Sequence, residues 1–214
     1  MEGILVPKQK GNEMNESLVK YLAGLLDADG SMSFHFRRQR DQHKEDLYYM
    51  GVTLRLASSA AVDRHGFVFT LPELTGMGSV YKSGPKQQFH TWLISKRADL
   101  EMLVPRLVKH MVIKAKHWQW QFDTLREKRG QLLTPAQCDE IRQASKISRT
   151  TQSGPLKPKN HPTWAWLAGY LDGDGTYLLK CYTTHAGYEQ WHVSMSAVAH
   201  VNDGAVLHFL QRTL

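Results

Sequence analysis

The stretch LAGLLDADG at Leu22–Gly30 returns almost unchanged as LAGYLDGDG at Leu167–Gly175. Seven of the nine positions are identical, and the two copies lie 145 positions apart. In each copy a helical pattern comes before the two aspartates, and alternating polar and apolar residues follow them. We call this nonapeptide the repeated word. Because both the nonapeptide and the pattern around it recur, the chain is an internal duplication.

The first copy begins with a helix and continues as a hairpin. Apolar residues recur at spacings of three and four from Ser17 onwards, which predicts an amphipathic helix. We expect Gly30 and Gly175 to stop the two helices in the left-handed conformation that glycine tolerates. Polar and apolar residues then alternate over residues 31–37 and 49–56, which predicts two strands with one buried face each.

The rest of the first copy predicts a second hairpin and more helices. Two strands are expected to join around Gly84 and Pro85. Residues 60–74 are ambiguous, because FVFTLP has strand propensity while its place between two hairpins suits a short helix. Helical periodicity over residues 97–129 predicts two helices that meet near residues 110–116.

A helix and a linker separate the two copies. Thr134 is a suitable N-cap, and Pro135 suits the first position of a helix. The stretch SRTTQSGPLKPKNHPTW follows, and its Pro, Gly, Ser and Lys content is typical of a linker. We expect the second helix to begin near Pro162. The predicted organisation is a first domain over 1–130, a helix and linker over 131–163, and a second domain over 164–214.

Composition narrows the functional class. The formal charge of +7 favours a polyanionic partner, because clustered Lys and Arg displace counterions from phosphates. Cys138 and Cys181 are too few for a disulfide framework and too far apart for a zinc site. Neither a membrane span nor the apolar core of a signal peptide is present in the sequence. We therefore predict a protein that is neither membrane-bound nor secreted.

The repeated word carries two features that need explanation. Gly24 and Ala28 share one helix face, as do Gly169 and Gly173, and such small residues predict direct packing of the two helices at a domain interface. The paired acids are unfavourable, because the end of a helix already carries about half a negative charge.

The aspartates therefore predict a cation between the two helix ends. If those ends lie side by side, Asp29 and Asp174 repel each other unless a divalent ion lies between them. Solvated turn aspartates are the structural alternative. A calcium loop is excluded by spacing, because glycine comes fourth from Asp27 rather than sixth.

Both nonapeptides resemble the signature of the LAGLIDADG homing endonucleases, in the monomeric two-repeat form. The order of hairpin, short helix, GMGSVY hairpin and helices is similar to the αββαββα half of that family. The resemblance implies an α+β fold of two tandem αββαββα halves. These halves would be related by pseudo-two-fold symmetry, with their antiparallel sheets forming a saddle.

The resemblance also implies an active site. In that family the last acid of each motif binds the catalytic metals, which implies Asp29 and Asp174 as metal ligands and catalytic residues. Their neighbours Asp27 and Asp172 match the earlier, supporting acid. Lys114 in VIKAK matches the lysine that polarises the hydrolytic water or stabilises charge at the phosphate. Mg²⁺ is the implied metal, and Ca²⁺ or Mn²⁺ could substitute in crystals.

The polar faces of the strands would then contact double-stranded DNA through base edges and phosphates. The family often has a water-binding Gln on the second strand, but Leu54 or Arg55 and Met195 occupy that position here. The candidate DNA-binding residues on these polar faces are Ser33, His35, Arg37, Arg38, Gln39, Arg40, Tyr49, Thr53, Arg55, Tyr81, Lys82, Lys180, Tyr182, His192, Ser194 and Ser196.

The sequence thus predicts a DNA endonuclease that hydrolyses phosphodiester bonds and promotes intron or intein mobility. The alternatives are an RNA-binding intron maturase and a catalytically silent DNA-binding protein on the same scaffold. Retention of Asp29 and Asp174 favours cleavage, because an RNA-binding maturase does not need metal-binding acids. The expected location is the cytoplasm, at a bacterial nucleoid, or the interior of an organelle.

The second copy is expected to be incomplete. From Gly30 to Gly130 the first copy has 100 residues, whereas only 39 follow Gly175. The last stretch, VNDGAVLHFLQRTL, takes the place of VDRHGFVFTLPELT in the first copy. We expect the remainder to be a separate C-terminal fragment, to have been removed, or to be supplied by a second chain. Without it, this chain should bind DNA weakly and cut poorly.

Overall fold

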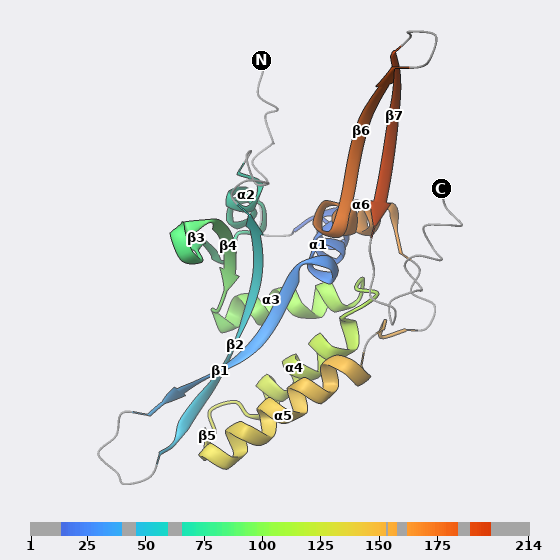
Figure 1. The fold of residues 1–214 in the computed structure, drawn as a ribbon. Coiled ribbons are helices and arrows are strands. Elements are labelled where there is room, and N and C mark those ends of the chain that lie inside the picture. The colour runs from blue at the N-terminus through green and yellow to red at the C-terminus, as the bar shows by residue number, and fades with distance from the viewer. Residues whose placement is uncertain are drawn as a thin grey trace.

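The computed structural model describes residues 14–39, 46–59, 66–152, 154–157, 162–183 and 189–197. Helices and strands follow the order that the duplication predicts, with an additional helix between the copies (Figure 1). The elements are α1 Glu16–Ala28, β1 Gly30–Arg38, β2 Tyr48–Ser59, α2 Phe67–Thr75, β3 Ser79–Ser83, η1 Pro85–Gln87, β4 Phe89–Ile94, α3 Arg97–Val108, α4 Ala115–Glu127, β5 Leu132–Leu133, α5 Pro135–Thr151, α6 Trp164–Asp174, β6 Gly175–Thr183 and β7 Glu189–Ala197.

The first copy forms an antiparallel sheet with helices on one face. Its strands lie in the order β1-β2-β4-β3, and the short β5 pairs with β2. Leu54, Trp92 and Ile94 point from the sheet into the core, where they are completely buried. Helices α3 and α4 pack on this face, and α1 and α6 complete the same core. The opposite face of the sheet carries the polar half of the alternating pattern.

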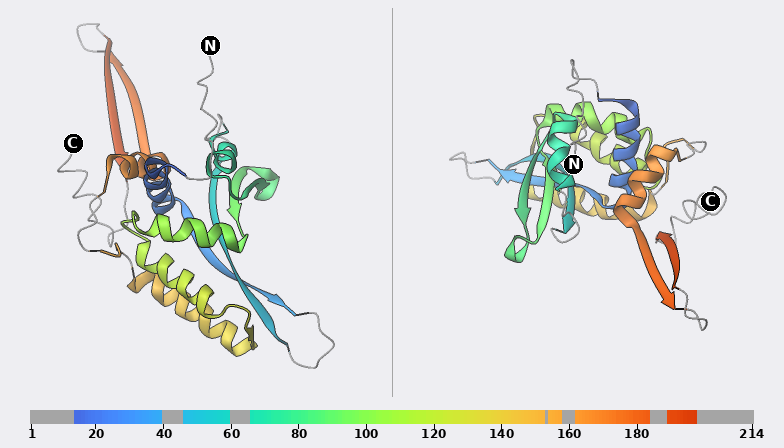
Figure 2. Two further views of the ribbon diagram at one scale, coloured as in Figure 1. Left: turned by 180° about the vertical axis from the view of Figure 1, so that it is seen from behind. Right: turned by 90° about the horizontal axis from the view of Figure 1, so that it is seen from above.

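The second copy repeats the start of the first. Helix α6 leads into the hairpin of β6 and β7, in which Gly175 pairs with Ala197 as Gly30 pairs with Leu56 in the first copy. The β1–β2 and β6–β7 hairpins extend in opposite directions from the α1–α6 pair (Figures 1 and 2). This arrangement is what a pseudo-two-fold axis between α1 and α6 produces. The expected continuation of the second copy over 198–214 lies outside the described residues.

Helices α1 and α6 pack through their backbones. A β-carbon added to Gly24 would overlap the carbonyl oxygen of Trp166, and one added to Gly169 would overlap that of Tyr21. Further along, Gly173 lies against Ala28, where an added β-carbon would come within 2.5 Å of the Ala28 β-carbon. The helices therefore run in the same direction and end together. The small residues of the repeated word set how closely they approach.

Gly30 and Gly175 do not have the conformation that the sequence analysis expected. Neither adopts a left-handed backbone: α1 is capped by Asp29 in the right-handed region, and Gly175 is extended with φ −78°. Their role is steric, because the chain turns back tightly over its own helix. A β-carbon on Gly30 would lie 2.6 Å from the Leu26 carbonyl oxygen, and one on Gly175 would overlap the Leu171 carbonyl.

The ambiguous segment 60–74 contains a helix, α2, in its described part. Its glycine caps, Gly66 and Gly76, are both left-handed, so packing and turn chemistry override the strand propensity of the sequence. The N-terminus of α5 has the predicted Thr134 cap, with a complete capping box. Among the described residues, no helix has the length and apolarity needed to cross a membrane.

Substitution of Gly24 by alanine should separate α1 from α6. The added methyl group would collide with backbone atoms, which cannot rotate away. We therefore expect the free energy of unfolding to fall by about 3 kcal/mol or more. Urea denaturation measures this loss. Ala168→Gly is the matched control, because Ala168 lies on the exposed side of α6 and its change costs about 1 kcal/mol of helix propensity. Equal losses in the two variants would contradict the close backbone contact.

Candidate active site at the paired helix ends

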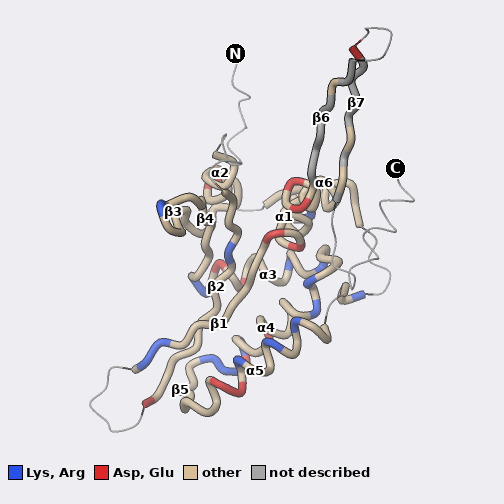
Figure 3. The backbone as a smooth tube through the Cα atoms, in the orientation of Figure 1, with Lys and Arg blue, Asp and Glu red and all other residues tan. Residues whose placement is uncertain are grey.

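The two last acids of the repeated words meet where α1 and α6 end. Asp29 follows directly on α1 and is exposed, and Asp174 is the last residue of α6 and is partly exposed. A β-carbon on Gly173 would lie 3.5 Å from a carboxylate oxygen of Asp29, so the Asp29 side chain lies over the end of the opposite helix. Figure 3 shows the acidic ends of both helices close together.

The electrostatics of this pair are unfavourable without a counterion. Partial burial and the neighbouring Asp174 carboxylate raise the pKa of Asp29, while the Lys114 ammonium opposes the rise. Both acids also lie at the negative ends of helix dipoles. A cation between the carboxylates would relieve both effects, and hard divalent ions prefer such oxygen ligands.

The protein supplies only part of a coordination shell. Among the described residues, no group of three or more His, Cys, Asp or Glu side chains is arranged to hold a metal ion. Two carboxylates would leave most coordination positions of a divalent ion to water or to oxygens of a ligand. Such a site suits a reaction in which the substrate completes the coordination.

Lys114 caps the C-terminal end of α1. Its ammonium group donates to the carbonyl oxygens of Leu26 at 3.1 Å, Ala28 at 2.7 Å and Gly30 at 2.9 Å. The Leu26 carbonyl also accepts from the Asp29 backbone N–H, and Gly30 is the first residue of β1. The lysine thus binds carbonyl groups on both sides of the helix end and offsets the negative end of the dipole. In the structure the Lys114 ammonium binds the backbone that carries Asp29. Its predicted action on water or phosphate stays a prediction.

Asp27 is a buried structural acid. Its carboxylate is 2% exposed and accepts from the backbone N–H groups of Val112 at 2.6 Å and Lys114 at 2.8 Å, and from the Trp166 indole at 3.0 Å. Burial raises the pKa of Asp27, and these hydrogen bonds oppose that rise. Asp27 thus fixes the turn before α4 that positions Lys114. Its counterpart Asp172 is exposed and accepts from the Tyr21 hydroxyl at 2.7 Å.

The exposed face of the first sheet carries most of the predicted polar residues. On neighbouring strands, Ser33 pairs with Thr53 and Arg37 with Tyr49, and the Ser33 and Thr53 hydroxyls are 3.3 Å apart. Between these pairs, His35 lies across Gly51, where an added β-carbon would overlap its ring. By strand alternation, this face carries Ser33, His35, Arg37, Tyr49, Thr53, Arg55 and Tyr81.

Two predicted residues lie on the other face of the sheet. Strand alternation places Arg38 opposite to Arg37, where it forms an ion pair with Asp46. It likewise places Lys82 on the same side as Val80, opposite to Tyr81. Grouping these basic residues with the polar face was wrong, because the sequence analysis included neighbours in the chain that alternate across the sheet. Gln39 follows the end of β1, and Arg40 lies outside the described residues.

The second hairpin repeats this arrangement in its backbone register. Lys180 pairs with His192, Leu178 with Ser194 and Thr176 with Ser196. Tyr182 follows two positions after Lys180 and pairs with Gln190. The five predicted residues of the second copy therefore occupy positions of the same parity in the backbone register of the hairpin.

Sequence reasoning missed three kinds of residue. Tyr21 and Trp166 donate across the helix pair, and their shared position before each repeated word was the available signal. Gly51 makes room for His35, which no pattern in one strand reveals. At the end of the β3–β4 hairpin, Lys86 and Gln87 have positive φ values of 65° and 52°. Such backbone strain is often found at functional loops.

Comparison with known proteins supports the fold through structure alone. No family model and no curated protein matches the sequence. The meganuclease I-SmaMI, in a structure bound to uncleaveable DNA, matches with a TM-score of 0.65 and 18% identity, over 96% of this chain and 73% of that chain. This chain has the LAGLIDADG homing endonuclease fold.

Two further structures with this fold also contain DNA. I-LtrWI, a LAGLIDADG homing endonuclease bound to target DNA, matches with a TM-score of 0.65 and 16% identity, over 93% of this chain and 72% of that chain. The LAGLIDADG meganuclease I-AabMI, bound to uncleaved DNA, matches with a TM-score of 0.59 and 15% identity, over 90% of this chain and 70% of that chain. This chain is thus shorter than the proteins whose fold it shares.

Replacement of Lys114 by methionine should destabilise the end of α1. Methionine keeps the length and packing of the side chain but removes the ammonium donor from the three carbonyl groups, which should cost about 2 kcal/mol of unfolding free energy. Thermal or urea denaturation measures the change. Lys116→Met, on the exposed side of α4, is the control and should stay within about 0.5 kcal/mol of wild type. A stable Lys114→Met protein would show that the cap is dispensable.

Proposed function

We propose that this protein is a divalent metal-dependent endonuclease that recognises and cleaves a specific double-stranded DNA sequence. One observation supports this above all: two solvent-accessible acids from duplicated motifs converge at the point from which two β-hairpins diverge. Strands of this kind suit the major groove, and the acids would then lie between the two contacted half-sites. We further propose that cleavage promotes the mobility of an intron or intein.

Asp29 and Asp174 are the residues that would hold the metal. When bound, a divalent ion stabilises negative charge at the phosphate and lowers the pKa of bound water. The chain itself contributes the two carboxylates, and Lys114 holds the backbone end that carries Asp29. We propose Mg²⁺ as the ion, because it keeps several waters and binds through few carboxylates together with phosphate oxygens.

An RNA-binding maturase is the second candidate, and a silent DNA-binding protein is the third. Neither needs two carboxylates to be held together against their repulsion. The raised pKa of Asp29, caused by burial and by Asp174, indicates an arrangement that costs stability in the absence of a cation. Retention of this arrangement therefore favours the metal-dependent nuclease.

Asp29→Asn and Asp174→Asn should each abolish double-strand cleavage. Loss of a metal ligand should abolish phosphodiester hydrolysis. The many phosphate contacts should keep DNA affinity within about tenfold of wild type. The substrate is a randomised DNA library incubated with Mg²⁺, in which sequencing of the cut ends defines the target. Asp123→Asn, at an exposed position on α4, is the control and should cut normally. Cleavage by Asp29→Asn at the wild-type rate would contradict the assignment.

The same variants have a readout that does not depend on cleavage. At neutral pH, Asp174→Asn removes repulsion from Asp29, so the metal-free protein should gain a few tenths of a kcal/mol to about 1 kcal/mol of stability. Ca²⁺ should raise the melting temperature of wild type but not of this variant. Because the folded pKa of Asp29 is raised, the metal-free protein loses stability as pH rises through it. The Ca²⁺ effect should therefore fade at acidic pH.

Arg55→Ala should relax the preference at particular base pairs by about 1 to 3 kcal/mol, because Arg55 is exposed on the polar face of the sheet. Affinity for a panel of single-base variants of the target measures this. Arg38→Ala is the matched control, since Arg38 lies on the other face and pairs with Asp46. A uniform loss across all sequences in Arg55→Ala would mark a phosphate contact instead.

A further inference from the structure

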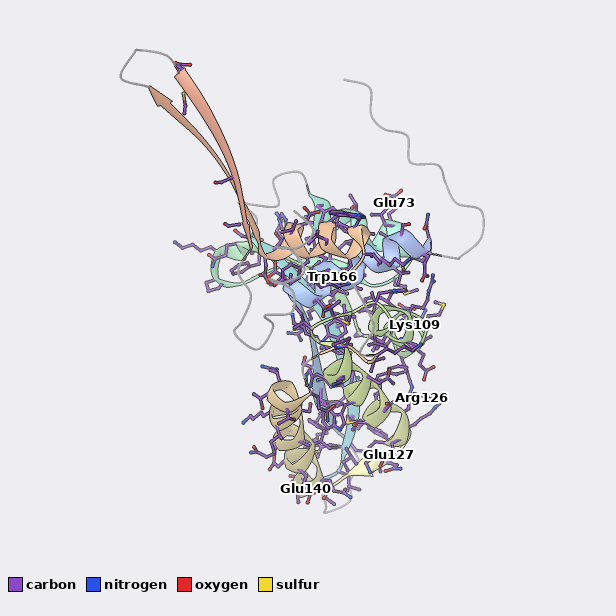
Figure 4. All side chains as sticks on the ribbon, turned by 90° about the vertical axis from the view of Figure 1, so that its right-hand side faces the viewer. Glu73, Lys109, Arg126, Glu127, Glu140 and Trp166 are labelled. Carbon is purple, nitrogen blue, oxygen red and sulfur yellow. The ribbon has the colours of Figure 1, made fainter. Side chains whose placement is uncertain are left out.

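Two hydrogen bonds cross between α1 and α6. The Tyr21 hydroxyl of α1 donates to a carboxylate oxygen of Asp172 on α6 at 2.7 Å, and the Trp166 indole N–H of α6 donates to Asp27 on α1 at 3.0 Å. Figure 4 labels Trp166 where α6 passes over α1. Burial and the Asp172 carboxylate raise the pKa of Tyr21, so this phenol stays protonated and remains a donor.

The two bonds are equivalent under the pseudo-two-fold axis. Tyr21 and Trp166 each occupy the position immediately before the repeated word, and Asp27 and Asp172 each occupy its sixth position. A phenol in one copy and an indole in the other thus perform the same contact with different chemistry. We call this pair of contacts the crossed bonds.

The crossed bonds supply what the glycine contacts lack. Backbone packing through Gly24 and Gly169 sets the distance between the helices, but it makes no directional contact with the side chains near the helix ends. A slide of one residue moves a helix end by about 1.5 Å and turns its side chains by about 100°. Directional hydrogen bonds to carboxylates fix that register, because a shift of this size breaks them.

We propose that Tyr21 and Trp166 are positioning residues, each of which holds the acid-bearing end of the opposite helix. Tyr21 holds Asp172, two residues before Asp174, and Trp166 holds Asp27, two residues before Asp29. Each half of the protein therefore orients the acid of the other half. This inference rests on the proposed function only for its effect on cleavage.

The two ends are not held equally firmly. The α1 end is also fixed by the 112–114 backbone at Asp27 and by the Lys114 cap. Within the part of the chain that the structure describes, Asp172 is exposed and the crossed bond from Tyr21 is the one hydrogen bond to its side chain. Loss of the Tyr21 hydroxyl should therefore disturb the end of α6 more than loss of the Trp166 N–H disturbs the end of α1.

Hydrogen exchange on the metal-free protein tests the crossed relation directly. Tyr21→Phe should speed amide exchange in the last turn of α6 several-fold while leaving the last turn of α1 unchanged. Trp166→Phe should have the reverse effect, and a smaller one. A purely local packing role predicts loosening of the helix that carries the substitution. That result, or no change at either end, would overturn the proposal.

Two control variants remove the same atoms elsewhere. Tyr48→Phe removes a hydroxyl from the partly buried side of β2, and Trp164→Phe removes an indole N–H from the exposed start of α6. Neither should change exchange at the helix ends. Exchange changes in the controls equal to those in Tyr21→Phe and Trp166→Phe would assign the effect to general loosening and would overturn the proposal.

Cleavage provides a second test. On the identified target, Tyr21→Phe and Trp166→Phe should slow the cutting of one strand by about tenfold, because small misplacements of catalytic groups are costly, and the two variants should affect opposite strands. Accumulation of nicked duplex with strand-specific labels measures this bias. Equal slowing of both strands by both variants would contradict independent positioning of the acids. If wild type cuts no DNA, the proposed function fails, and the exchange experiment still decides the crossed relation.

Discussion

The structure depends on the direct contact of two helix backbones. Gly24 and Gly169 let α1 and α6 approach until side chains no longer separate them, and an added methyl group would overlap the carbonyl oxygens of Trp166 or Tyr21. This contact brings both helix ends to one place, so that each copy contributes one acid to a shared site. The strands that follow each end then diverge, because the chain leaves the helix pair on opposite sides.

A polar network links this contact to the candidate site. Asp27 is held among N–H groups of residues 112–114 and of the opposite helix, and the same turn sends Lys114 back to the end of α1. Burial of a carboxylate is tolerable only when its hydrogen-bonding capacity is filled, and here the turn 112–114 and helix α6 fill it. The first acid of the repeated word thus serves structure, which leaves the second, Asp29, exposed for a ligand.

Local patterns in the sequence predicted the elements but not the contacts between them. The helices and the hairpins were foreseen, because periodicity and caps such as Thr134 act within a few residues. The left-handed role given to Gly30 was wrong, since tight return of the chain over Leu26 demands glycine instead. The Lys114 cap joins residues more than 80 positions apart, and no local pattern encodes it.

The same Lys114 cap has a consequence for synthesis of the protein on the ribosome. Helix α1, which precedes Asp29, leaves the ribosome early. The carbonyl groups at its C-terminal end can be capped only after Lys114 has been translated, more than 80 residues later. Contacts between distant parts of a chain form late, because the intervening loop must first close. A nascent chain can therefore build its sheet before its first acid is locked in place. The acidic site can therefore be completed only after Lys114 and α6 have been translated.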